Sequence, residues 1–316
     1  ENLLGPEHPE TAAALTGVAQ LYVTLGQYER AEPLYQRALE IRQTLTGEHS
    51  PLTATTLHGL GWLRAGQGHY AEADQLYVRA LAIREASLGN DNMATATTLN
   101  AMGQLRIHQG RYAEAEELFI RDRDIAQKLI GPHHPDGAGT LTSLGQLRVV
   151  QGRHSDADAL FAQALGIRQQ SFGSDHPATA TTLTALAWLR VSQGCLREAA
   201  ALYDRALDVR MRKLGPRHPW VARTLGGMAE LALREGALMR ADELNCRALD
   251  IRLEVLSPRH PDIAQCHWIN ARVLAGYGYD EEARTQLKRA LDLLESVVSP
   301  GHVVRLKVEE MRARLN

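Results

Sequence analysis

The fold is decided by residues 176–210, which read HPATATTLTALAWLRVSQGCLREAAALYDRALDVR. The first half begins at Pro177, whose fixed φ suits the first turn of a helix. It places apolar residues such as Leu183 and Ala187 at the spacing of one buried helical stripe. Gly194 ends this helix, and the second half repeats the same spacing. Because neither helix can bury its stripe alone, the stretch predicts an antiparallel helix pair that packs on further pairs.

The helix pair recurs along the chain with a period of 42 residues and no insertion or deletion. An alanine marks every second helix, at Ala31, Ala73, Ala115, Ala157, Ala199, Ala241 and Ala283. A small residue marks every first helix, at Ala19, Gly61, Gly103, Gly145, Ala187, Ala229 and Ala271. Small side chains let crossing helices approach to about 8 Å instead of about 10 Å. The sequence therefore predicts an all-α stack of tightly packed helix pairs.

We predict a single domain over residues 1–316, built from seven repeats and a C-terminal helix. The repeats are expected at residues 9–46, 51–88, 93–130, 135–172, 177–214, 219–256 and 261–298. Residues 303–316 carry Leu306, Met311 and Leu315 on one side and charged residues on the other, which predicts a capping helix. The opening ENLLGPEHP matches a junction between two repeats, so we expect the chain to belong to a longer protein.

The repeat resembles a known family. An alanine follows the small first-helix residue after twelve positions, and an aromatic residue follows four positions later, at Tyr35, Tyr77, Phe119, Phe161 and Tyr203. This pattern resembles the tetratricopeptide repeat, whose usual period is about 34 residues. The 42-residue period, the LGPEHP-like linkers and the ALxIR endings are similar to the kinesin-light-chain type. The resemblance implies a right-handed superhelical solenoid of the kind found in bacterial stand-alone repeat proteins and in sensor regions of signalling NTPases.

Composition narrows the class of partner. The chain has 44% hydrophobic residues and a formal net charge of −2. This weak charge argues against nucleic-acid and membrane-surface partners, and no apolar run has the length of a membrane span. The three cysteines have neither metal nor redox spacing. We expect them to be reduced in a cytoplasmic protein, and no signal peptide is visible.

Catalytic and metal chemistry is not expected. Histidines precede prolines at His8, His134, His176, His218 and His260. Stacked repeats place such histidines about 10 Å apart, whereas zinc needs ligands at about 2 Å, so we expect these side chains to cap helices or pack in linkers. No GxxxxGK, GxSxG or HExxH motif occurs. We predict no catalytic residue, no metal and no cofactor; an enzyme that uses the histidines is the disfavoured alternative.

The resemblance implies that the first helices line a concave groove that receives a peptide or protein segment. The candidate groove residues stand at equivalent first-helix positions: His58, Trp62, Asn100, Gln104, Thr142, Ser143, Gln146, Thr184, Trp188, Arg223, Glu230, Trp268 and Arg272. Trp62 and Trp188 lie three periods apart and would serve as apolar anchors, unless both rings pack on neighbouring helices. Kinesin light chains carry Asn-Asn pairs in this groove, and Asn100 alone matches that pattern here.

Charge favours an acidic ligand end. Arg223 and Arg272 lie with Glu230 in the C-terminal half of the predicted groove, where a carboxylate would be attracted. We therefore expect a protein-interaction module. The alternatives are the ligand-sensing region of a larger signalling NTPase or protease, and a structural scaffold that self-associates through an apolar face at the N-terminal end.

Two repeats depart from the pattern. In the third, Asp122 and Arg123 replace an Ala-Leu pair, which indicates either a local lattice of salt bridges or a softer joint with a docking point on the outer face. In the seventh, His267 and Trp268 replace a leucine and a small residue, and we expect a changed environment near the terminal cap.

Overall fold

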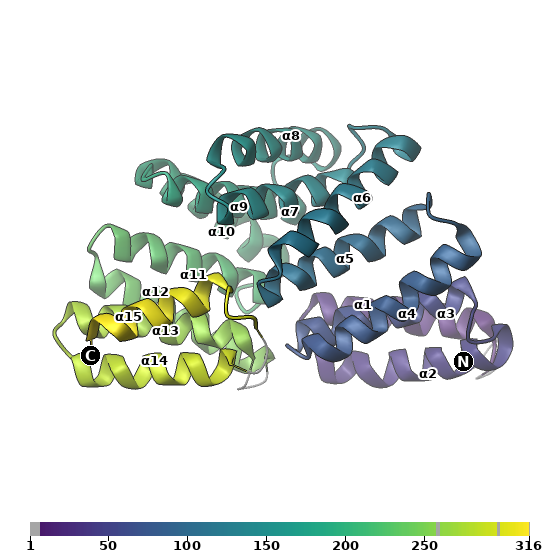
Figure 1. Ribbon diagram of the computed structural model, residues 1–316, viewed down its shortest axis with the longest axis horizontal. Coiled ribbons are helices and arrows are strands. Elements are labelled where there is room, and N and C mark those ends of the chain that lie inside the picture. The colour runs from purple at the N-terminus through teal and green to yellow at the C-terminus, as the bar shows by residue number, and fades with distance from the viewer. Residues whose placement is uncertain (1–6, 257–259, 296–297, 316) are drawn as a thin grey trace. The chain divides into compact units, whose positions relative to one another are not determined.

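The computed structural model describes residues 7–256, 260–295 and 298–315, and within them it contains helices and no strand (Figure 1). The helices are α1 (Pro9–Thr24), α2 (Tyr28–Thr46), α3 (Pro51–Gly66), α4 (Tyr70–Leu88), α5 (Met93–Gln109), α6 (Tyr112–Ile130), α7 (Gly137–Val150), α8 (His154–Phe172), α9 (Pro177–Ser192), α10 (Leu196–Leu214), α11 (Pro219–Arg234), α12 (Leu238–Val255), α13 (Pro261–Gly276), α14 (Asp280–Leu294) and α15 (Val303–Leu315). Consecutive helices form antiparallel pairs, which confirms the predicted all-α repeat fold.

The helices belong to two compact units. One unit comprises Glu1–Ile107 and Ala113–Gly131, and the other comprises His108–Tyr112 and Pro132–Asn316. We call them the N-terminal unit and the C-terminal unit and describe each by itself. No helix in the described ranges is both long enough and apolar enough to cross a membrane.

Histidine side chains cap the first helices. The Nδ1 atoms of His8, His176, His218 and His260 each accept a hydrogen bond from the amide two residues later, at 3.0–3.2 Å. Proline follows each cap and lacks the N–H that would otherwise need a partner. The structure thereby confirms that these linker histidines cap helices. Before α7 the analogous bond, from the Asp136 amide to His134, belongs to a turn, and the helix begins only at Gly137.

Aromatic rings fill the space that the small first-helix residues leave. The ring of Phe161 is fully buried on α8, and a Cβ placed on Gly145 of α7 would lie 2.4 Å from it. Tyr77 relates to Gly61 in the same way, at 2.7 Å. In the sixth repeat the buried Asn245 replaces the aromatic residue, and its amide donates to the Cys266 carbonyl at 3.0 Å.

An arginine clamp joins successive repeats. Arg210, near the end of α10, is 1% exposed and donates to the Trp220 carbonyl at 2.9 Å and the Thr224 hydroxyl at 2.6 Å. Four further arginines make the same two contacts, to a carbonyl ten residues later and a side chain fourteen residues later: Arg42, Arg84, Arg168 and Arg252. Ala126 occupies this position in the third repeat and cannot form the clamp.

Candidate functional site

The N-terminal unit contains four of the predicted groove residues. His58 and Trp62 both lie on α3. The His58 ring packs against Tyr77 with a centroid distance of 5.4 Å, and its Nδ1 is buried without a hydrogen-bond partner in the described structure. Burial, together with the positive charge of Arg84, lowers the pKa of His58 to about 3. The His58 side chain is therefore uncharged at physiological pH.

Trp62 is half-buried. Its ring packs on the apolar cluster that includes Ala19, Val23 and Tyr35, so one face of the indole belongs to the core. The rest of the Trp62 side chain is open to solvent. The ring packs on neighbouring helices and still offers an apolar edge.

The two predicted groove amides bond to one another. Gln104 donates to the Asn100 carbonyl oxygen at 2.8 Å, and Asn100 donates its own amide to Asp122 of α6 at 2.8 Å. Asp122 is 4% exposed and stands where other second helices carry a fully buried alanine. The Asn100 amide is thus directed toward α6, and Gln104 is the exposed member of the set.

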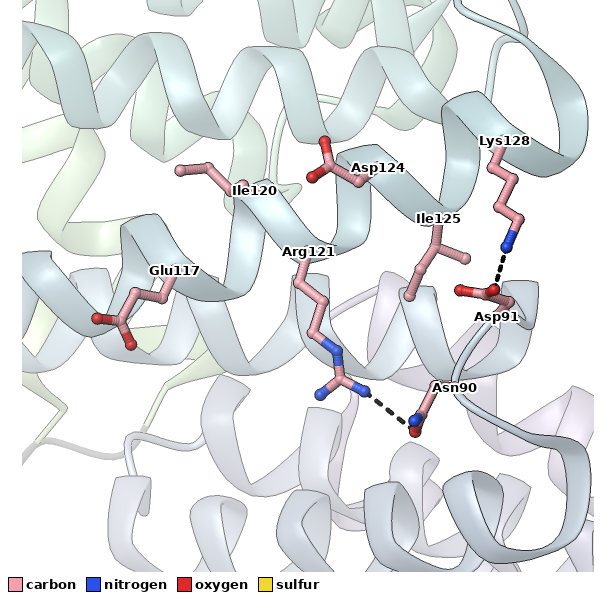
Figure 2. A pocket seen from close by; sticks show the side chains of 8 residues that line it. All are labelled: Asn90, Asp91, Glu117, Ile120, Arg121, Asp124, Ile125 and Lys128. Carbon is pink, nitrogen blue, oxygen red and sulfur yellow. Dashed lines mark hydrogen bonds and ion pairs between the residues drawn. The ribbon is translucent and has the colours of Figure 1, made fainter.

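The charged residues beside Asp122 also pair locally. Arg121 donates to Glu85 at 2.6 Å and to Asn90 at 3.3 Å, and Arg123 donates to Asp124. Figure 2 shows Arg121 directed toward Asn90 in a depression of about 470 Å³. Asp91, Asp124 and Lys128 also line this depression. In the same depression Lys128 is paired with Asp91. This geometry agrees with a lattice of salt bridges at the third repeat.

In the C-terminal unit, most of the predicted groove residues on α7 and α9 have buried side chains. Thr142 and Thr184 are buried, and their hydroxyls donate to carbonyls of their own helices, at 2.8 and 2.9 Å. Ser143 is buried as well, with 5% exposure. These three hydroxyl groups are therefore not presented to a ligand, and half-buried Gln146 is the predicted groove residue of α7 that keeps accessible surface.

Trp188 of α9 repeats the situation of Trp62. It is half-buried and packs on the cluster that contains Val149, Phe161 and Leu189. One period earlier and later on the first helices stand Gln146 and Glu230. The four equivalent residues Gln146, Trp188, Glu230 and Arg272, on α7, α9, α11 and α13, are called the first-helix ladder below.

The C-terminal end of this ladder is covered by α15. Lys307 donates to Glu230 at 3.0 Å, and its ammonium group lies 4.9 Å from the centre of the Trp268 ring. The Arg272 guanidinium lies 4.9 Å from the same ring, so two cations flank the buried indole. Trp268 and Glu230 are consequently already engaged. The sequence pattern of residues 303–316 did not reveal the Lys307 contact, because its partners lie 39 and 77 residues away.

Arg223 of α11 is exposed to solvent. The protein atoms around its guanidinium group nevertheless desolvate it in part, which lowers its pKa. The nearby Asp262 carboxyl feels burial, which raises its pKa, but His260, Arg252 and other neighbours outweigh this and lower the pKa to about 2. Asp262 is therefore a carboxylate at any physiological pH. Arg223 places an accessible positive charge near this carboxylate.

The C-terminal segment also contacts the α5–α6 turn inside the C-terminal unit. The Ser299 amide donates to the Gln109 carbonyl at 2.8 Å, and the Val303 amide donates to the Tyr112 hydroxyl at 3.1 Å. Gly110 has φ +77°, and a Cβ there would lie 2.7 Å from Ser299 Oγ. A glycine is required for this close approach.

No group of three or more His, Cys, Asp and Glu side chains in the described ranges is placed to hold a metal ion. The histidines of the linkers are directed at helix ends instead.

Comparison with known proteins gives consistent matches to one repeat family. The family model described as "Tetratricopeptide repeat" matches residues 1–44, 24–86, 94–170, 138–210 and 189–254. No curated protein matches the sequence significantly.

Solved structures show the same fold. BtubC (BKLC) from P. vanneervenii is 22% identical, with 72% of this chain and 90% of that chain covered and a TM-score of 0.51. The TPR-like repeats of a Podosopora anserina kinesin light chain are 21% identical, covering 65% and 97%, with a TM-score of 0.50. A Rap protein complexed with Competence and Sporulation Factor is 12% identical, covering 97% and 98%, with a TM-score of 0.61.

Proposed function

Because the chain belongs to the tetratricopeptide-repeat family, a family of protein-interaction modules, we propose that it binds an extended peptide segment across the first-helix ladder of its C-terminal unit. The observation that carries the proposal is the contrast between first-helix residues that Lys307 of α15 covers and first-helix residues that stay accessible. Glu230 and Trp268 are engaged by Lys307, whereas Gln146, Trp188 and Arg223 keep accessible surface.

The accessible residues suit a ligand of defined chemistry. The open edge of the Trp188 indole would receive an apolar or aromatic side chain. The Gln146 side chain can donate a hydrogen bond to a backbone carbonyl of the peptide or accept one from a backbone amide. The exposed Arg223 guanidinium would bind a carboxylate. The carboxylate of Asp262 is close enough to interact with Arg223 and would repel a second negative charge on the ligand. The preferred ligand is a peptide with an apolar anchor followed by one acidic group.

A displayed library of random dodecapeptides, selected on the purified chain, tests the proposal. We expect peptides with one aromatic or large apolar residue and one acidic residue, and we expect Trp188→Ala and Arg223→Glu each to weaken them at least about tenfold. Arg205→Glu makes the same charge change at an exposed position of α10 and should leave affinity unchanged. Circular dichroism checks the folding of each variant. Peptides that bind Trp188→Ala and the parent chain equally would place the binding site elsewhere.

A sensing role is the second candidate, and α15 is the observation that favours it. Lys307 joins this terminal helix to Glu230 and Trp268 through contacts that a basic ligand group could replace. A Rap protein of similar fold has been solved with a factor bound, although at 12% identity the similarity extends to the fold alone. In a sensor, Lys307→Ala would raise peptide affinity and the hydrogen exchange of α15 together. An unchanged affinity would leave the binding module as the function.

A further inference from the structure

Two hydrogen bonds of the C-terminal unit join the segment before α15 to the α5–α6 turn. The Ser299 amide donates to the Gln109 carbonyl at 2.8 Å, and the Val303 amide donates to the Tyr112 hydroxyl at 3.1 Å. We call these two bonds the latch. His302 lies between the two donors in the sequence, directly before α15, and its own amide donates to the Ser299 carbonyl at 3.1 Å. The backbone of His302 is therefore part of the latched segment.

The closed latch does not accommodate a protonated His302 ring. The side chain is half-buried, and its Nδ1 atom is buried without a hydrogen-bond partner in the described structure. The α5–α6 turn packs closely on this residue, since a Cβ on Gly110 would lie 2.8 Å from His302 Cα. Both nitrogens of a protonated imidazole are donors. Protonation in the closed latch would thus bury a charged donor without an acceptor, which is costly.

Titratable groups of other elements surround His302. His108, at the end of α5, and Asp262 of α13 interact with it directly. The further groups that interact with Asp262 are His260 before α13, Arg252 of α12 and Arg223 of α11. Asp262 is a carboxylate with a pKa of about 2, so it attracts a proton to His302, whereas the cations of this set shield that attraction.

The groups nearest to His302 along the chain and in the turn add no net charge. On α15, Arg305 pairs with Glu309 and Lys307 pairs with Glu230. In the α5–α6 turn, burial raises the pKa of Tyr112, so its hydroxyl stays neutral and accepts the Val303 amide.

The balance of these effects keeps the His302 ring neutral while the latch is closed. Burial lowers the pKa of His302 to about 4; His108 acts in the same direction, and Asp262 opposes both. A histidine released into water takes up its proton near pH 6.5. Between these values the open latch binds more protons than the closed latch. Opening therefore becomes more favourable as pH falls, by up to about tenfold per pH unit.

We propose that His302 makes the latch a pH-sensitive switch, which mild acid opens. The consequence reaches α15, because Lys307 bonds to Glu230 and lies beside the Trp268 ring. In the described part of α15, Val308 is the one buried side chain, so the helix depends on polar contacts and on the segment before it. Opening the latch loosens the cover of Glu230 and Trp268. The switch is a property of the latch and does not depend on the ligand proposed above.

Hydrogen exchange with mass spectrometry tests the proposal on peptides that cover residues 298–306. The measured quantity is the protection factor, which removes the pH dependence of the intrinsic exchange rate. We expect it to fall about tenfold between pH 7.5 and pH 5.5. Peptides of α9 should remain far better protected at both pH values, which separates latch opening from unfolding of the whole unit. Equal protection factors at the two pH values, or no protection at pH 7.5, would overturn the proposal.

Two histidine variants assign the effect. His302→Asn removes the titratable ring and keeps a side chain that suits the start of a helix, so its protection factor should change less than about threefold over the same range. His267→Asn is the matched control. Burial lowers the pKa of His267 too, but its ring hydrogen-bonds with Gln286 of α14, and the full tenfold change at residues 298–306 should remain. A His302→Asn chain with the pH dependence of the parent would overturn the role of His302.

Discussion

Asn100 of α5 donates its side-chain amide to the buried carboxylate of Asp122 on α6, at a distance of 2.8 Å. The repeat pattern places an alanine at the second position, whereas the first position varies from glycine to threonine, histidine and tryptophan. The third repeat thus replaces an apolar contact between its two helices with a hydrogen bond to a charged group, and Gln104 extends the network to the surface.

This pairing predicts an energetic coupling. Asp122→Ala restores the alanine of the other repeats but removes the acceptor of the Asn100 amide, and we expect it to lower the free energy of unfolding by about 1–3 kcal/mol. The double variant Asn100→Ala with Asp122→Ala should lose less than the sum of the single variants, by about 1 kcal/mol. Urea unfolding followed by circular dichroism measures the cycle. Strictly additive losses would show that the two side chains do not stabilise one another.

The periodic series explain how much of the fold could be predicted. Small first-helix residues and second-helix aromatics such as Gly145 and Phe161 repeat every 42 residues, so the helix pairs and their packing follow from the pattern alone. The arginines of the ALxIR endings were visible too. Their role as clamps was not, because a guanidinium reaches a carbonyl and a hydroxyl that only the packed helices bring together.

The candidate site was less predictable for a physical reason. Sequence equivalence assigns a residue to one side of a helix, but it does not determine which rotamer the side chain takes. Thr142 and Thr184 bond to their own helices, and Lys307 covers Trp268. The individual groove residues remain a prediction that the binding experiment above tests.

The arginine clamp should contribute strongly to stability. Burial, with a smaller effect of Arg223, lowers the pKa of Arg210 to about 9, so the guanidinium is still charged at pH 7. Arg210→Met would leave the Thr224 hydroxyl and the Trp220 carbonyl without this donor, and we expect a loss of about 2–4 kcal/mol. Arg210→Lys keeps the charge but not the planar donor geometry and should recover only part of the loss.

Thermal and urea unfolding measure these losses. Arg205→Met, on the exposed side of the same helix α10, is the matched control and should change stability by less than about 0.5 kcal/mol. An Arg210→Met variant as stable as this control would contradict a structural role for the clamp.

Two glycines have nearly the same backbone conformation but different surroundings, so substituting each by alanine distinguishes the cost of backbone strain from the cost of a steric clash. Gly110 and Gly194 have φ +77° and +78°, so alanine at either position costs about 1 kcal/mol. A Cβ on Gly194 meets nothing within 4 Å, whereas a Cβ on Gly110 would lie 2.8 Å from His302 Cα. Gly110→Ala should therefore be the more destabilising change. It should also speed hydrogen exchange of the Ser299 amide, which bonds to Gln109. Equal effects of the two substitutions on that amide would show that the α5–α6 turn does not hold the C-terminal segment.

The low pKa of His58 makes stability depend on pH. An unfolded histidine takes up its proton near pH 6.5, whereas burial and the nearby Arg84 keep His58 neutral in the folded chain down to about pH 3. Between these values the unfolded state binds more protons, so the free energy of unfolding falls as pH falls, by at most about 1.4 kcal/mol per pH unit for this side chain. Thr16, Thr142 and Thr184 occupy the equivalent position in other repeats, so His58→Thr is a substitution that the fold accommodates.

The measurement compares urea unfolding of the parent chain and His58→Thr between pH 7.5 and pH 4.5. Above pH 7 the two stability curves should run parallel, because His58 is neutral in both the folded and the unfolded state. Below pH 6.5 the parent should lose up to about 2.7 kcal/mol more than the variant by pH 4.5, since the variant lacks the buried imidazole. The other histidines with lowered pKa values, His108, His267 and His302, are present in both proteins, so their contributions cancel in the difference. Curves that stay parallel down to pH 4.5 would contradict the lowered pKa of His58. They would mean that neither burial nor the charge of Arg84 opposes protonation of its ring in the folded chain.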